Sequence, residues 1–309
     1  MTAILLWPKF DLEISKEMVT DTVSKVKDGG CCIGCGACAY LSDSYKVTLN
    51  EHGYFQAEST GKIVDEQSED LIAEVCPFSN SGPNEDAIAL KLYGDLKRDA
   101  SLGHYGDIYA GRTAADDWYV RGSSGGLGKW VLHKLLAEGL VDYVVEVCEN
   151  DDPSQIYKYR VIDSAEDVIN GSKSVYYPVE LSEILKRISS QEGRYAITGL
   201  PCFIKTIRRL QAQQDVFKNR IKYTLSVVCG HLKSTAYAEL IAWQLGVAPN
   251  DLSNIDFRLK IDGSKANQKG VVAKSLSGKA SRQDIVQNIF GTNYGHGFFK
   301  YEACDYCDD

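Results

Sequence analysis

Three cysteines at two-residue spacing are the feature of this chain best suited to chemistry. Cys32, Cys35 and Cys38 form a C-x2-C-x2-C run, and Cys76, which is followed by Pro77, lies further along the chain. Three closely spaced thiolates with a remote Cys-Pro are typical of 4Fe-4S ligation in bacterial ferredoxins. The pattern therefore predicts an iron–sulfur site, and with it electron transfer.

The residues around this run leave some alternatives open. Gly34 and Gly36 lack a Cβ, so the backbone can pass close to an inorganic core and direct its N–H groups at sulfur. Cys31 could replace Cys32, although the x2-x2 register uses Cys32. Structural zinc is an alternative, but zinc usually takes two CxxC pairs. Thiols without any metal are a further alternative.

Four further cysteines predict a second metal site: Cys202, Cys229, Cys304 and Cys307. The first two follow the predicted strands 195–198 and 221–228, and parallel strands joined by a crossover end at the same edge of a sheet. Neighbouring strands lie about 4.8 Å apart, so thiols at their ends can share a ligand. Zinc, or a buried thiol at a strand–helix turn, would be the alternative at Cys202.

Two further residues, Cys148 and His231, are not predicted metal ligands. Cys148 ends an apolar strand and is expected to be a small core residue. His231 follows Cys229-Gly230 at the predicted ligand edge and is the candidate for proton transfer, although a structural role is the simpler expectation.

A Gly/Ser-rich turn predicts an anion site. Ser123, Ser124, Gly125 and Gly126 precede an apolar-periodic helix. Backbone N–H groups at a helix start bind phosphate, and serine hydroxyls add donors. Lys173 is the candidate to neutralise the phosphate charge. A turn that simply caps the helix, together with an ordinary surface lysine, is the alternative.

The rest of the chain supplies the elements that must position these groups. Residues 1–28, with Val19, Val23 and Val26 at helical spacing, predict a helical lead-in. Residues 29–84 predict a compact iron–sulfur module, in which a hairpin near 45–54 precedes a helix that delivers Cys76. Residues 100–309 predict an α/β domain with a mixed, largely parallel sheet. Its expected strands are 141–147, 195–198 and 221–228, and its expected helices 181–188, 204–210 and 236–245.

Composition excludes some classes of partner. The net charge of -8 provides no basic surface for a nucleic-acid backbone. No run of about twenty apolar residues predicts a membrane span, and the short apolar stretch 3–7 lacks the basic start of a signal peptide. A cytoplasmic protein is therefore expected, in which ten cysteines serve as metal or redox ligands rather than disulfides.

Together the motifs resemble the coenzyme F420 hydrogenase/dehydrogenase beta-subunit family of iron–sulfur flavoproteins. The matching segments, in the family's order, are 32–38, 76–77, 123–126, 198–202, 229–230 and 304–308. The resemblance implies a flavin domain with a small ferredoxin-like insert near the N-terminus. It implies FAD with its pyrophosphate near residues 123–126, Thr198 and Gly199 among the cofactor-binding residues, and one 4Fe-4S cluster or two.

The function implied by the resemblance is that of an oxidoreductase. It would pass electrons between 4Fe-4S clusters and FAD, and from FAD to or from coenzyme F420 or another organic substrate, with a redox partner protein or subunit. A non-catalytic electron-transfer subunit and a zinc-stapled interaction protein are the alternatives. Relatives continue beyond the last CxxC, whereas this sequence stops two residues after Cys307, so the sequence leaves open whether the native polypeptide extends past Asp309.

Overall fold

The computed structural model describes residues 21–171, 173–265 and 267–307. In chain order its helices and strands are α1 (Thr22–Asp28), α2 (Ala37–Leu41), β1 (Tyr45–Leu49), β2 (Phe55–Ser59), α3 (Glu66–Val75), α4 (Glu85–Tyr93), β3 (Lys97–Asp99), β4 (Gly103–Tyr105), α5 (Asp116–Arg121), α6 (Leu127–Ala137), β5 (Tyr143–Glu149), β6 (Tyr157–Ile162), α7 (Ser182–Ser190), β7 (Tyr195–Gly199), α8 (Pro201–Gln213), α9 (Asp215–Arg220), β8 (Ile221–Ser226), α10 (Thr235–Gln244), β9 (Leu252–Leu259), β10 (Gly270–Ser275) and β11 (Ala280–Gln283). Short 3-10 helices lie at Glu166–Asn170, Pro249–Asp251, Val286–Asn288, Tyr294–His296 and Glu302–Tyr306.

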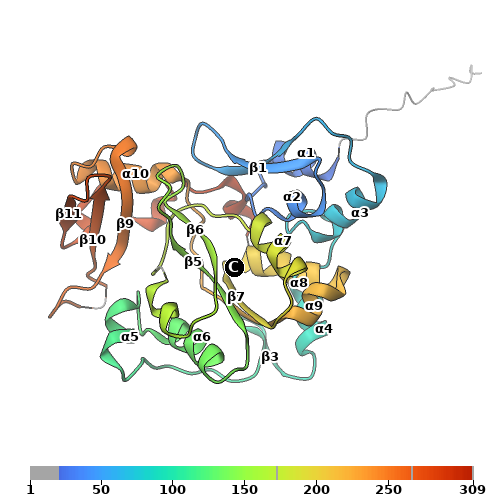
Figure 1. The fold of residues 1–309 in the computed structure, drawn as a ribbon, viewed down its shortest axis with the longest axis horizontal. Coiled ribbons are helices and arrows are strands. Elements are labelled where there is room, and N and C mark those ends of the chain that lie inside the picture. Colours follow the sequence, from blue (N-terminus) through green and yellow to red (C-terminus); the bar gives the residue numbers. More distant parts are fainter. Residues whose placement is uncertain (1–20, 172, 266, 308–309) are drawn as a thin grey trace, which may run out of the picture.

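A mixed four-stranded sheet organises the fold, with strand order β6-β5-β7-β8 (Figure 1). β7 is parallel to both β5 and β8, whereas β6 is antiparallel to β5. In the β7–β8 register Gly199 lies opposite Ser226, so the two strands end at the same edge. The predicted mixed α/β fold is confirmed, and so is the shared edge.

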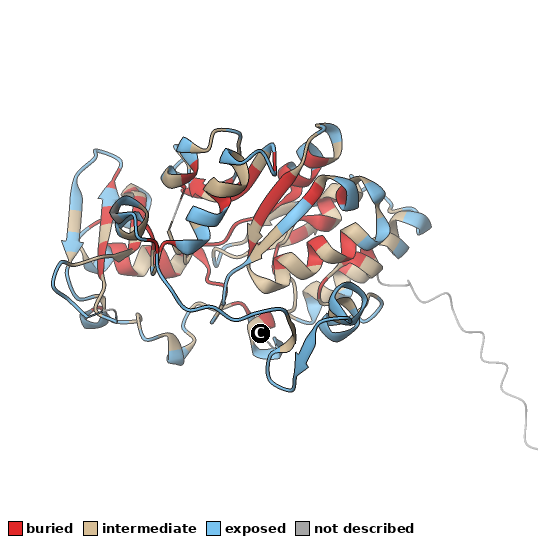
Figure 2. Ribbon diagram, turned by 90° about the horizontal axis from the view of Figure 1, so that it is seen from below, coloured by how far each residue is buried: buried red, intermediate tan, exposed pale blue. Residues whose placement is uncertain are grey.

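Helices cover both faces of this sheet (Figure 1). On one face Leu132 of α6 packs with Val144 and Ala196. On the other face the helices α7, α8 and α9 pack against Val145 and Ile197 within a larger core. Burial on both faces explains the nearly continuous apolar sequence of β5, and Figure 2 shows buried residues running through the sheet and the flanking helices.

The first cysteines lie in a module of α1, α2, the hairpin β1–β2 and α3. Asp21 caps α1 by accepting from the Ser24 N–H at 2.8 Å, and Asp65 caps α3 by accepting from the Ser68 N–H at 2.9 Å. The hairpin is confirmed, and α3 ends with Cys76 as its C-cap, as predicted. Of the predicted helical lead-in, α1 is confirmed, while residues 1–20 with Val19 lie outside the described residues.

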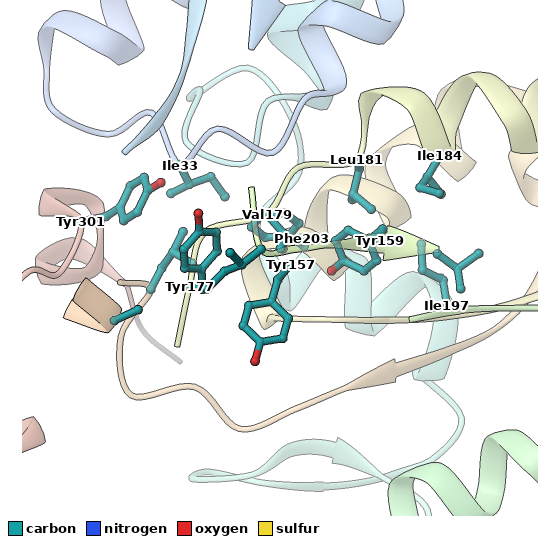
Figure 3. Packing of buried hydrophobic residues seen from close by; sticks show 14 of the residues in the cluster. Ile33, Tyr157, Tyr159, Tyr177, Val179, Leu181, Ile184, Ile197, Phe203 and Tyr301 are labelled. Carbon is teal, nitrogen blue, oxygen red and sulfur yellow. The ribbon is translucent and has the colours of Figure 1, made fainter. Parts of the chain in front are cut away.

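One hydrophobic core joins this module to the sheet and to the end of the chain. Figure 3 shows Ile33 of the first cysteine loop and Tyr301 of the C-terminal segment packing beside Tyr177 and Val179. The Tyr301 hydroxyl also accepts a hydrogen bond from the Phe55 N–H at 2.7 Å. Segments far apart in sequence therefore meet where the cysteines lie.

The structure differs from the sequence prediction in several elements. An antiparallel sheet with order β11-β10-β9, the edge strand β6, helix α4 and the hairpin β3–β4 were not predicted. The predicted strand 221–228 ends at Ser226, and Val228, which lies beyond this end, is fully exposed. In the described residues no helix combines the length and the apolar character that a membrane crossing requires.

Candidate functional site

The four cysteines of the first set line one cavity: Cys32, Cys35, Cys38 and Cys76. The cavity contains about 470 Å³ of space, part of it open to solvent, and apolar walls such as Val75 surround it. Two of the cysteines lie in the loop between α1 and α2, one lies in the first turns of α2, and the last caps α3. Cys31 also lines the cavity, so the choice between Cys31 and Cys32 stays a prediction.

Gly34 and Gly36 shape the loop that carries these thiols. Their φ angles are +64° and +87°, in the left-handed region that glycine adopts without strain. A Cβ on Gly34 would lie 2.5 Å from the Cβ of Phe55, and a Cβ on Gly36 would lie 2.7 Å from the Ser182 N. Phe55 of β2 and Ser182 of α7 therefore occupy the positions that side chains at Gly34 and Gly36 would need, so the loop packs directly against β2 and α7.

The electrostatics of the first set favour a bound cation. Burial raises the pKa of Cys35 to about 12, and the Cys76 thiolate adds to the shift. Burial likewise raises the pKa of Cys38, with repulsion from Cys35, Cys32 and Cys76 in the same direction. The Ala57 N–H donates to Cys32 Sγ at 3.4 Å. Buried thiolates that repel one another are stabilised by iron, and N–H···S bonds are a usual part of iron–sulfur sites, so the donor set fits a cluster.

The second set of cysteines lines a separate cavity of about 410 Å³, part of it open to solvent; its lining includes Cys202, Cys229, Cys304 and Cys307. Cys202 lies in the first turn of α8, directly after β7, and Cys229 follows β8. Burial raises the pKa of Cys202, and the thiolates of Cys229 and Cys307 act in the same direction. Cys304 Sγ accepts a hydrogen bond from the Leu232 N–H at 3.4 Å.

The two cavities are neighbours. Ile33 and Phe78 line both of them. The Cys35 thiolate contributes to the raised pKa of Cys202, after the effects of burial, Cys229 and Cys307. Thr206 connects the sets, because its hydroxyl donates to the Cys202 carbonyl at 3.1 Å and also lowers the pKa of Cys35 through a hydrogen bond.

In the described residues, neither the two cysteine sets nor the other side chains of metal-ligand type are arranged to hold a single metal ion. No group of three or more His, Cys, Asp or Glu side chains in the described residues has the arrangement for holding one. Cys148 is buried in β5, where the sequence predicted a core residue.

His231 lies on the wall of the second cavity. Its ring stacks on Tyr294 with a centroid distance of 5.6 Å. Burial lowers the pKa of His231, and the Lys233 ammonium lowers it further. The structure thus places this histidine beside the second cysteine set, and proton transfer by it stays a prediction.

The Gly/Ser turn joins α5 to α6. Gly126 has φ +79° and begins the helix. In the described part of the chain, the N–H groups of residues 123–126 donate no main-chain hydrogen bond. The Ser123 hydroxyl accepts from the Ser174 N–H at 2.6 Å, which holds the turn against the following segment. Available N–H groups at a helix start fit an anion site.

The ends of the parallel strands lie near this turn. A Cβ added to Gly128, in the first turn of α6, would lie 3.9 Å from Leu225 of β8. Thr198 donates its hydroxyl to the Val145 carbonyl at 3.4 Å. Gly199 ends β7, where a Cβ would lie 3.1 Å from Ile204 of α8. The predicted cofactor-binding residues therefore gather at the carboxyl edge of the sheet, the usual ligand edge of such sheets.

Two lysines are of interest around the turn: Lys173, which the sequence singled out and whose role stays a prediction, and Lys260. Lys173 pairs with Asp256 at 2.8 Å, so its charge is engaged within the protein. Lys260, which the sequence did not single out, donates to the Ser124 carbonyl at 2.7 Å and lies over the Tyr119 ring. Burial lowers the pKa of Lys260 to about 8, and Lys269 and other cations act in the same direction. A bound anion would relieve this repulsion.

A buried carboxylate on the central strand was also missed. Glu146 of β5 is 4% exposed, and in the described structure its Oε1 has no hydrogen-bond partner. Burial raises the pKa of Glu146 to about 7, and Lys129 opposes this shift. The Lys129 ammonium donates to the carbonyls of Ile169 and Gly171. The apolar pattern of strand β5 predicts an apolar residue at position 146. No sequence pattern therefore indicates that Glu146 and Lys129 interact.

Two family models match the chain. The model described as "Coenzyme F420 hydrogenase/dehydrogenase, beta subunit N-term" matches residues 108–186, and the model for the C-terminal part of the same protein family matches residues 192–309. Together they cover more than half of the chain. The chain belongs to this family. The matched ranges of the F420 hydrogenase/dehydrogenase beta-subunit family include the Gly/Ser turn and all four cysteines of the second set.

Two individual proteins are similar to parts of this chain. A coenzyme F420-dependent sulfite reductase of Methanocaldococcus jannaschii is 26% identical over 192 residues, which are 61% of this chain and 26% of the relative. The chain thus spans about a quarter of that relative's length. A solved chain of the F420-reducing [NiFe] hydrogenase complex from Methanosarcina barkeri superposes with a TM-score of 0.48 at 16% identity, over 69% of each chain.

Proposed function

We propose that this chain is an iron–sulfur flavoprotein oxidoreductase that passes electrons between 4Fe-4S clusters and FAD, and from FAD to or from coenzyme F420 or another organic substrate. Membership of the F420 hydrogenase/dehydrogenase beta-subunit family supports a role in redox electron transfer. The observation that carries the finer proposal is the pair of four-cysteine cavities that share the walls Ile33 and Phe78.

Each cysteine set has its own role in this proposal. The first set, Cys32, Cys35, Cys38 and Cys76, would hold one cluster inside the N-terminal module. The second set, Cys202, Cys229, Cys304 and Cys307, would hold another at the carboxyl edge of the sheet. Cys307 is exposed, so the second site reaches the protein surface. Neighbouring sites with one shared wall suit transfer of single electrons between them.

The Gly/Ser turn supports FAD as the flavin. Residues 123–126 would direct their N–H groups at its pyrophosphate, and Lys260 would supply positive charge beside them. Bound FAD would supply the exchange between two-electron chemistry on an organic substrate and the one-electron chemistry of iron–sulfur clusters. Glu146, which is buried, and Lys129, which is half-buried, would set the charge behind this site.

Anaerobic reconstitution with iron and sulfide, in the presence of FAD, tests the proposal. We expect flavin bands over a broad iron–sulfur shoulder in the visible spectrum, and low-temperature EPR signals after reduction. The variant Cys202→Ala should retain about half of the iron, because only the second set loses a ligand. A colourless, EPR-silent protein that binds zinc instead would contradict the proposal and favour the interaction protein.

A second candidate is a non-catalytic electron-transfer subunit of a larger redox complex. The exposed Cys307, which brings the second cysteine set to the protein surface, favours it. Turnover assays with reduced coenzyme F420 and nicotinamide distinguish the two. Protein that binds FAD and iron, but turns over only with an added redox partner, would favour this second role.

A further inference from the structure

A buried arginine lies directly beneath the fourth cysteine of the first set. Arg209 of α8 is 2% exposed. Its guanidinium donates to the carbonyl of Cys76, to that of Gly82 at 3.0 Å and to that of Pro83 at 2.9 Å. One side chain therefore holds both ends of the loop that carries the Cys-Pro motif.

The surroundings of this guanidinium are built for close approach. A Cβ on Gly82 would lie 2.8 Å from Arg209 Cζ, so only glycine leaves room for the ring of hydrogen bonds. The nearby carboxylate of Glu85 is bound by Lys205 at 2.7 Å. The guanidinium itself donates to three neutral carbonyls; Glu85 and Glu74 lie close enough to act on its charge, but within the described residues neither is hydrogen-bonded to it.

Helix α8 brings this charge to the cysteines. It packs against α3, which Cys76 terminates (Figure 1). Along one side of α8 lie Cys202 of the second set, Thr206 at the Cys35 thiol, and Arg209 at the Cys76 carbonyl. Spacings of four and three residues place these side chains on one helix face.

We infer that Arg209 is a positioning residue of the first cluster: it fixes the Cys76 loop and raises the reduction potential of the cluster by placing a buried positive charge beside a ligand. This inference rests on the proposed function. Reduction adds a negative charge to the cluster, and charge and hydrogen bonding around a cluster set its potential. A buried cation a few bonds away favours the reduced state, since little water screens it.

A redox titration followed by EPR tests the charge. Wild type, Arg209→Gln and Arg209→Lys are prepared in the Cys304→Ala background, so that only the first cluster contributes a signal. We expect Arg209→Gln to lower the equilibrium constant for one-electron reduction about tenfold, which is a shift of about 59 mV to more negative potential. Arg209→Lys keeps the charge and should titrate close to wild type.

Arg208→Gln is the matched control. Arg208 is the neighbouring residue on the same helix, but its guanidinium donates to Tyr93 and Thr224, each at 2.9 Å, instead of to the cysteine loop. We expect its variant to titrate at the wild-type potential. An Arg209→Gln protein with a bound cluster and an unshifted potential would overturn the inference, because a purely structural staple predicts that result.

The apoprotein provides a second measurement that needs no cluster. We expect iodoacetamide to alkylate Cys76 several-fold faster in Arg209→Gln than in wild type, because the loop loses three hydrogen bonds, with an unchanged rate at Cys202. Peptide mass spectrometry reads both sites. Equal rates of Cys76 alkylation in wild type and Arg209→Gln would overturn the positioning role. This measurement also decides the question for a variant that takes up no iron. Wild-type protein that takes up no iron would instead overturn the proposed function.

Discussion

Replacing Gly34 by alanine tests how tightly the first cysteine loop is built. Gly34 lies between Cys32 and Cys35, with φ +64°. A Cβ at this position would lie 2.5 Å from the Phe55 Cβ and 2.6 Å from its carbonyl carbon. Such distances are too short for non-bonded carbon atoms, so either the loop or strand β2 must move.

The magnitude follows from two separable costs. A left-handed backbone costs an L-residue about 1–2 kcal/mol. Overpacking adds about 1–3 kcal/mol, because Phe55 cannot move away easily. Its N–H is bonded to the Tyr301 hydroxyl at 2.7 Å, and it pairs with Leu49 in the hairpin. We therefore expect Gly34→Ala to destabilise the protein by roughly 2–5 kcal/mol.

Gly61→Ala is the matched control for the backbone term. Gly61 also has a positive φ, +85°, but no atom lies within 4 Å of its added Cβ. It should therefore lose only about 1–2 kcal/mol. Thermal unfolding followed by circular dichroism reads both variants, at about 1.5 °C per kcal/mol for a chain of this size.

The iron content gives a second distinction between these variants. We expect Gly34→Ala to take up less iron, because relief of the clash moves the loop that holds Cys32 and Cys35, and Gly61→Ala to take up as much as wild type. Equal losses of unfolding temperature in the two variants would refute the packing argument. So would an unchanged iron content in a Gly34→Ala protein whose unfolding temperature is lowered.

Three further predictions concern charge and ligand choice. Burial raises the pKa of Glu146 from 4.5 to about 7, so the folded protein holds a proton that the unfolded chain releases, and stability falls as the pH rises through that range. Glu146→Gln should lack this loss of stability, which is on the order of 1–3 kcal/mol. If the difference in unfolding temperature between wild type and Glu146→Gln does not grow between pH 5 and pH 8, the assignment is refuted. Cys32→Ser should lose about half of the iron and Cys31→Ser none. The reverse result would show that the cluster uses Cys31, which has three residues between it and Cys35. Lys260→Gln should weaken FAD binding about tenfold in a fluorescence titration, since a charged contact contributes about 1.5 kcal/mol. The control variant Lys274→Gln, at an exposed strand position, should bind FAD like wild type. Equal affinities of the two variants would remove Lys260 from the site.

Local sequence patterns were sufficient for much of the fold. Helix α3 with Cys76 at its end, the hairpin β1–β2 and the strand–helix pairs around β7 and β8 all follow from periodicity, caps and turn residues. These signals act within a few residues, so they are readable without a structure. The antiparallel sheet β9–β11 and the edge strand β6 depend on distant pairing partners and were missed.

Residue types and their spacing were enough to indicate which side chains can do chemistry: two sets of four cysteines, and a Gly/Ser turn at a helix start. Their arrangement became visible only in the folded chain. Folding brought the two sets to neighbouring cavities that share Ile33 and Phe78, put Arg209 beneath Cys76, paired Lys173 with Asp256, and brought Lys260 to the turn. The difference arises because spacing along the chain limits which ligands can share a loop, whereas contacts between distant segments come from packing in a common core, which no local pattern encodes.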